Sequence, residues 1–135
     1  MKKKLMISLA GLLIAGAMPI LAHHSFAAEY DDKSPIQLNG AITKVEWANP
    51  HIVLYIDVKD EAGKVTNWSL EGGPPNGLFR QGWRKDTLKP GDMVKVEGFR
   101  AKDHSNLVNM RTIIRAADGK KMFAGTSGDG APGEK

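Results

Sequence analysis

The chain has 135 residues, a formal net charge of +4 and no cysteine. This length allows a single domain. The lack of cysteine excludes disulfides, thiolate metal sites and cysteine nucleophiles, so the domain must be held together by its core.

Residues 1–22 have the pattern of a secretory signal peptide. Lysines at positions 2–4 precede a largely apolar run over residues 5–17. This run is shorter than the ~20 residues that a membrane span needs. We therefore expect cleavage near Ala22, a periplasmic or secreted location and no stable membrane insertion of the mature chain. A cut after Ala27 or Ala28 is the alternative.

Cleavage changes the charge balance. It would remove three lysines and no acid, leaving 16 of the 19 basic residues against 15 acidic ones, so the net charge would fall to +1. This near-neutral balance argues against nucleic acid as a partner. In the mature chain we predict an arm over residues 23–34, a domain over 35–124 and a disordered tail, rich in Gly, Ser and Pro, over 125–135.

Residues 40–58 predict two long strands joined at Asn49-Pro50-His51. The second strand alternates strictly: its apolar residues at 52, 54, 56 and 58 face one side, and Tyr55 faces the other. The apolar phase of the first strand, which we expect to begin at Pro35, slips near Gly40. Such a slip predicts a bulge or a sharp bend.

The remaining elements complete an all-β pattern. We predict a third strand over residues 64–71, a short helix from 77 to about 83, and strands over 93–100, 108–114 and 121–123. Asn76 is the expected helix N-cap. Phe79 and Trp83, four residues apart, should share the face that plugs the open end of a barrel. In the fifth strand the residues at 108, 110, 112 and 114 share one phase.

Three strands, a short helix and two further strands follow the order of an OB-fold. The predicted fold is therefore a small five- to six-stranded antiparallel OB-like barrel, with one short helix between strands three and four. Another small antiparallel barrel, or a sandwich with the same strand count, is the alternative.

Three motifs carry a resemblance to a known family. They are the start of the mature chain at 23–31, HHSFAAEYD, then KVEWANPH at 44–51 and DTLKPGD at 86–92. Together they resemble a family of small, secreted, uncharacterised bacterial proteins. The resemblance implies an exported single-domain β-barrel protein and implies no activity.

Histidines provide the sharpest chemical hypothesis. Cleavage after Ala22 would make His23 the N-terminal residue, so that its α-amine and imidazole could chelate one metal ion. A third nitrogen would complete an all-nitrogen set suited to Cu(II). His51 is the best candidate for it, and His24 and His104 are alternates. The structural alternative is a solvated chain end, a turn-capping His51 and an exposed His104.

A competing hypothesis is a binding module for a small molecule, a glycan or a protein partner. In it the rim residues Trp47, Asn49 and Tyr55 carry recognition, as exposed aromatics do in OB-folds. A structural envelope protein without a small ligand is a third reading. No pair of carboxylates and no serine lies in a catalytic context, so we expect no enzymatic activity and no cofactor other than copper.

Overall fold

The computed structural model describes residues 26–125 of the chain. The predicted signal peptide, His23, His24 and almost all of the predicted tail lie outside these described residues.

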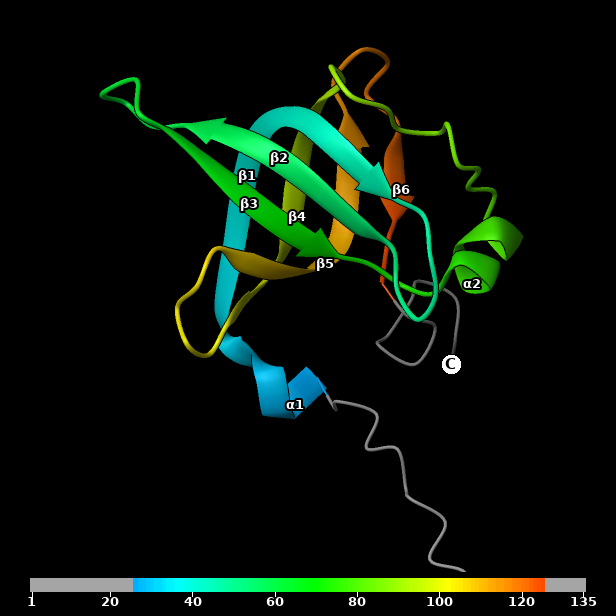
Figure 1. Cartoon of the computed structure of the whole chain (residues 1–135), viewed down its shortest axis with the longest axis horizontal. Helices are drawn as coiled ribbons and strands as arrows, with labels where there is room; N and C mark the ends of the chain where they lie inside the picture. The colour runs from blue at the N-terminus through cyan, green and yellow to red at the C-terminus, as the bar shows by residue number, and fades with distance from the viewer. Residues whose placement is uncertain (1–25, 126–135) are drawn as a thin grey trace, which may run out of the picture.

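The described chain is all-β apart from two short helices (Figure 1). Its elements in chain order are α1 (Phe26–Glu29), β1 (Tyr30–Glu46), β2 (Val53–Lys59), β3 (Val65–Glu71), α2 (Pro75–Arg80), β4 (Met93–Ala101), β5 (Leu107–Arg115) and β6 (Lys121–Phe123). The strands form one sheet in the order β3-β2-β1-β4-β5-β6. Its neighbours are antiparallel, and β3 also pairs in parallel with β5 over residues 69–71 and 107–109.

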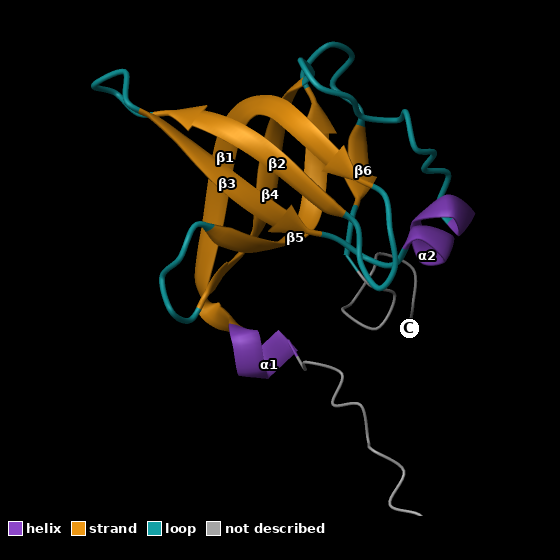
Figure 2. Ribbon diagram, viewed as in Figure 1, coloured by secondary structure: helices purple, strands orange, loops and turns teal. Residues whose placement is uncertain are grey.

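Strong curvature of β1 allows this arrangement (Figure 2). One half of the strand pairs with β4, and the other half pairs with β2. The register with β2 shifts between Ile42 and Lys44, so Thr43 is an extra residue there. The bulge predicted near Gly40 is confirmed. At Gly40 itself a Cβ would lie 2.4 Å from the Asp57 carbonyl oxygen, so only glycine allows this close strand contact.

The core lies between the inward faces of the strands, as the alternation predicts. Its most deeply buried side chains are aliphatic: Ile42, Ile52, Leu54, Ile56, Leu70, Leu78, Val96, Val108, Met110 and Ile113. Trp83 adds a buried ring, and its Nε1–H donates to the Phe123 carbonyl oxygen at 3.0 Å. This bond joins the segment after α2 to the edge strand β6.

Two predicted boundaries are wrong. The first strand begins at Tyr30 rather than at Pro35, because Tyr30 pairs with Ala101 of β4. The helix occupies Pro75–Arg80, with Pro74 rather than Asn76 at its N-cap. Proline suits the first helical position because its nitrogen has no hydrogen, and a backbone N–H at that position would have no partner within the helix.

Phe79 does not plug the sheet. It is 54 % exposed, whereas Leu78 and Trp83 are buried. The helix ends before Trp83 because Gly82 adopts a left-handed conformation with φ of 97°. The Phe79 ring instead lies under the Arg84 guanidinium, whose Cζ is 3.9 Å from the centroid of the ring.

The phase predicted for the fifth strand is also wrong after Met110. Glu97 pairs with Thr112 but Gly98 pairs with Met110, so Arg111 is an extra residue in β5. Beyond this bulge Ile113 faces the core, and Thr112 faces outward.

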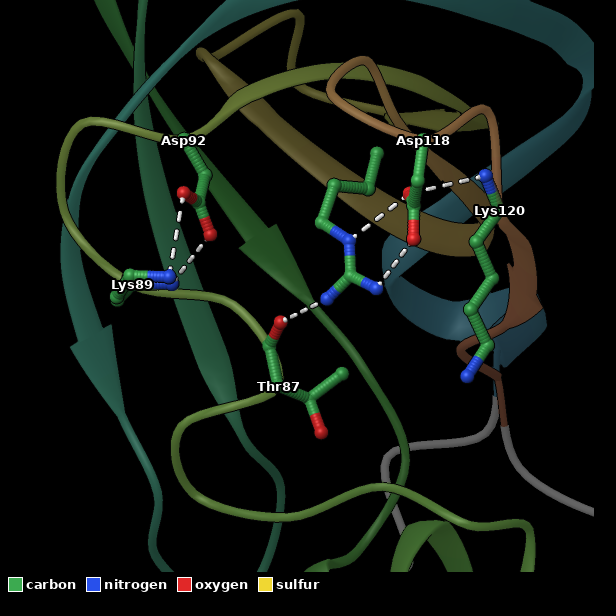
Figure 3. Close-up of polar contacts among 6 residues, drawn as sticks. Thr87, Lys89, Asp92, Asp118 and Lys120 are labelled. Carbon is green, nitrogen blue, oxygen red and sulfur yellow. Dashed lines mark hydrogen bonds and ion pairs between the residues drawn. The ribbon is translucent and has the colours of Figure 1, made fainter.

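The motif at residues 86–92 has a structural role (Figure 3). Its turn is closed by the Lys89 N–H, which donates to Asp92 at 3.0 Å. Arg115 Nη1 donates to the Thr87 carbonyl oxygen at 2.8 Å, and its Nε and Nη2 bind Asp118 at 3.0 and 2.7 Å. Arg115 therefore joins this loop to the turn between β5 and β6.

This contact predicts an acid-dependent loss of stability. The hydrogen bonds from Arg115 lower the pKa of Asp118 from 3.8 to about 2. A carboxyl whose pKa is lower in the folded state stabilises the fold above its unfolded pKa, and the contribution is lost as the pH falls through the folded pKa. The stability difference between the native chain and Asp118→Asn should therefore shrink between about pH 4 and pH 2. Urea unfolding over this range measures it, and a difference constant with pH would contradict the assignment.

Candidate functional site

His51 lies in the loop between β1 and β2, at the end of the sheet where β3 finishes. Its Nδ1 is 2.9 Å from Oε1 of Glu71, the last residue of β3. The sheet register sets this contact, because Val53 at the start of β2 pairs with Glu71. A carboxylate only accepts hydrogen bonds, so Nδ1 is the donor, and in the neutral imidazole Nε2 carries the lone pair. The His51 side chain is 39 % exposed.

Glu71 also joins this histidine to the start of the described chain. Its Oε2 accepts a hydrogen bond from the Tyr30 hydroxyl at 2.7 Å. Burial of Tyr30, and then the hydrogen bond and charge of Glu71, raise the pKa of the Tyr30 hydroxyl, so it remains a donor at physiological pH. His51, Glu71 and Tyr30 thus form one hydrogen-bonded chain, which we call the His51 triad.

The short helix α1 is fixed beside this triad. Phe26 stacks on the Tyr30 ring, with 5.7 Å between centroids, and meets Phe99 edge-on at 5.5 Å. The Lys102 N–H donates to the Glu29 carbonyl oxygen at 2.9 Å, and the Lys102 ammonium donates to Ala27. Phe26 packs through these ring contacts, and Tyr30 is buried. Figure 1 shows α1 at the start of β1, next to the turn between β4 and β5.

His104 lies in the turn between β4 and β5, two residues after the Lys102 that binds α1. It has a positive φ of 59°, and its carbonyl oxygen accepts a hydrogen bond from Arg100. Within residues 26–125 no group of three or more histidine or acidic residues is placed to hold a metal ion. Of the two described histidines, His51 is the one whose ring nitrogen lies within hydrogen-bond distance of a carboxylate.

The three predicted rim residues have different surroundings. Trp47 is partly buried and packs against the core, and Asn49 is exposed at a cis peptide bond to Pro50. Tyr55 faces outward as predicted, and its hydroxyl donates to Glu46 at 3.3 Å. Lys44 lies 5.4 Å from the centroid of the same ring and pairs with Glu46 at 2.6 Å. Tyr55 is thus part of a local surface network on β1 and β2.

Glu71 is the site residue that the sequence did not identify. The sequence predicts a turn-capping role as the structural alternative for His51, and no local pattern links His51 to a carboxylate twenty residues later. The useful signal was the strict alternation of β2 and β3. Once these strands are paired through a short turn, their far ends meet, and the loop residue before β2 lies beside the last residue of β3.

The fold and the site define a small all-β protein with an exposed histidine held by a strand carboxylate. A family model matches residues 10–109, and the chain belongs to this family of unknown function, DUF6152. Comparison with curated proteins finds no match. No helix within residues 26–125 has the length and apolarity to cross a bilayer.

Proposed function

We propose that this is an exported, non-enzymatic metal-binding protein, and that its metal is copper. In this proposal His23 supplies its α-amine and imidazole, and His51 supplies Nε2 as the third nitrogen. Three nitrogen donors in this arrangement suit Cu(II). His24 and His104 are the alternate ligands.

The hydrogen bond from His51 Nδ1 to Glu71 is the observation that carries the proposal. Metal-binding histidines commonly donate their second ring N–H to a carboxylate, which fixes the tautomer and the ring orientation and makes the ligating nitrogen more basic. Glu71 is held in turn by Tyr30.

The position of α1 supports a role for the mature N-terminus. Phe26 follows His23 by three positions in the sequence, and a segment of this length can extend about 10 Å. Tyr30 and Glu71 are the only side chains in the series of contacts from Phe26 to His51. In this proposal, cleavage near Ala22 creates a new amine at the end of the short segment that precedes α1.

The proposed scaffold is an OB-like barrel. The parallel pairing of β3 with β5 brings the first strand of the sheet order against the fifth, which supports closure. The helix between β3 and β4 agrees with OB topology. On such a scaffold the loop that carries His51 lies on a rim, where ligands bind.

Glu71→Gln tests the supporting role of the carboxylate. The variant keeps the size of the side chain but weakens its hold on the His51 ring, so Cu(II) affinity should fall about 10- to 100-fold. Isothermal titration with a competing chelator, on protein purified from the periplasm, measures the loss. Glu46→Gln is the matched control, because Glu46 contacts Lys44 and Tyr55 rather than a histidine. Equal affinities for both variants would remove Glu71 from the site.

A further inference from the structure

The segment that begins in α2 carries an aromatic ring that the core does not use. Phe79 is 54 % exposed, although the sequence predicts that it plugs the barrel. The other large exposed hydrophobic side chains among residues 26–125 are Val65 and Met93, which start β3 and β4. Figure 1 shows α2 on the side of the molecule away from the turn between β2 and β3. The Phe79 ring is therefore an isolated apolar group on one side of the protein.

Positive charge is concentrated in the same segment. Residues 79–89 have a formal net charge of +3, from four exposed basic residues and one exposed acid: Arg80, Arg84, Lys85, Lys89 and Asp86. Residues 26–125 contain 15 basic and 13 acidic residues, a net charge of +2, so the rest of this range sums to −1. Lys89 lies 3.7 Å from Asp92. We call the remaining cations, together with the ring, the α2 patch: Phe79, Arg80, Arg84 and Lys85.

The cations of the α2 patch are not neutralised by carboxylates of the described chain. Arg84 lies over the Phe79 ring, and its Nη1 donates to the carbonyl oxygens of Phe79 and Trp83 at 3.3 and 2.7 Å. These acceptors carry no formal charge. Among residues 26–125, neither Arg80 nor Lys85 forms an ion pair. The patch thus combines one exposed ring with three cations in the six positions that follow it.

This combination suits a lipid surface better than a protein partner. A stable protein interface buries about 800 Å² on each partner around an apolar core, and a single ring is too small for such a core. A lipid surface needs less apolar area, because an aromatic side chain can lie at headgroup level while lysine and arginine contact phosphates around it. The planar donors of arginine also match phosphate oxygens. The near-neutral mature chain argues against the phosphates of a nucleic acid.

We infer that the α2 patch binds an anionic phospholipid surface, with the Phe79 ring at headgroup level and the three cations against lipid phosphates. The occupant follows from charge complementarity and from the single exposed ring. The contact is reversible adsorption, without insertion of a helix. It uses none of the proposed copper ligands and is independent of the proposed copper function.

Co-sedimentation with lipid vesicles tests the inference on the native protein. The exported chain is used in metal-free buffer, after intact mass has shown that the signal peptide is absent. It should bind vesicles of equal parts phosphatidylglycerol and phosphatidylcholine, and should bind phosphatidylcholine alone at least about tenfold more weakly. Binding should be lost at about 1 M salt, where charges are screened beyond ~3 Å. Equal binding to both kinds of vesicle would overturn the inference.

Two double variants test the cations. Arg80→Gln with Lys85→Gln removes two charges of the patch, and Lys59→Gln with Lys64→Gln removes two exposed charges beside the turn between β2 and β3. One cation near an anionic surface contributes about fivefold in affinity, so the patch variant should bind at least about tenfold more weakly. The control variant should stay within about threefold, because its charges lie away from the surface.

Phe79→Ala and Val65→Ala form the matched apolar pair, because their side chains are 54 and 52 % exposed. Phe79→Ala should weaken vesicle binding about tenfold, and Val65→Ala should leave it unchanged. Arg84 is kept, since its hydrogen bonds hold the segment after α2. An unchanged urea midpoint shows that each variant is folded. No binding of the native chain to anionic vesicles, or equal losses in patch and control variants, would overturn the inference.

Discussion

His51→Ala is expected to reduce the Cu(II) affinity of the mature protein by about 100-fold or more. Loss of a supporting contact alone costs 10- to 100-fold in typical sites, and this variant removes the ligating nitrogen itself. Chelator competition with isothermal titration measures the change. The fold should be retained, because His51 is half-exposed and Tyr30 still binds Glu71.

His104→Ala is the matched control for this experiment. His104 contributes its carbonyl oxygen to Arg100, and alanine supplies the same oxygen. The Cu(II) affinity of His104→Ala should remain within about twofold of the native value. Loss of a hydrogen-bond partner of a metal ligand, by comparison, costs about 10- to 100-fold. An unchanged affinity in His51→Ala would show that the His51 loop holds no metal. An equal loss in both variants would contradict the choice of His51 over His104 as the third ligand.

Gly98→Ala should have the largest effect on stability. A Cβ at this position would lie 2.0 Å from the Asn109 carbonyl oxygen, which is backbone and cannot rotate away. Strands β4 and β5 would have to separate at the bulge, so we expect a loss of about 3 kcal/mol or more in the free energy of unfolding. Urea denaturation measures it.

Gly77→Ala is the control for the glycine substitution. Gly77 is inside α2, and an added Cβ would meet Pro74 at an ordinary distance of 3.5 Å. Alanine favours a helix more than glycine does, so this variant should be neutral or more stable by up to about 1 kcal/mol. A small loss in Gly98→Ala, similar to the change in Gly77→Ala, would mean that β4 and β5 are not packed as closely as described.

The elements that could be predicted are those set by local pattern. Strict alternation from Ile52 to Val58 gave the correct buried face of β2, and a phase slip marked the bulge at Thr43. Both signals arise within a few neighbouring residues. They require no knowledge of which strand pairs with which.

The errors lie where distant strands decide the structure. The bulge at Arg111 depends on Gly98 of the neighbouring strand, and no alternation within β5 reveals it. Tyr30 was placed in an arm rather than in β1. Its strand partner is Ala101, which is distant in sequence, so no local pattern around Tyr30 reveals the pairing. The partner of His51 was missed for the same reason, since register alone brings Glu71 beside it.

The central claim is tested most directly by Cu(II) titration and EPR of two forms of the exported protein. One has its natural processed N-terminus, verified by intact mass, and the other carries one extra residue before His23. The account predicts tight one-to-one binding with nitrogen hyperfine structure in the natural form, and its loss in the extended form. Equal, weak binding by both forms, or a mature chain that begins after Ala27 or Ala28, would contradict it.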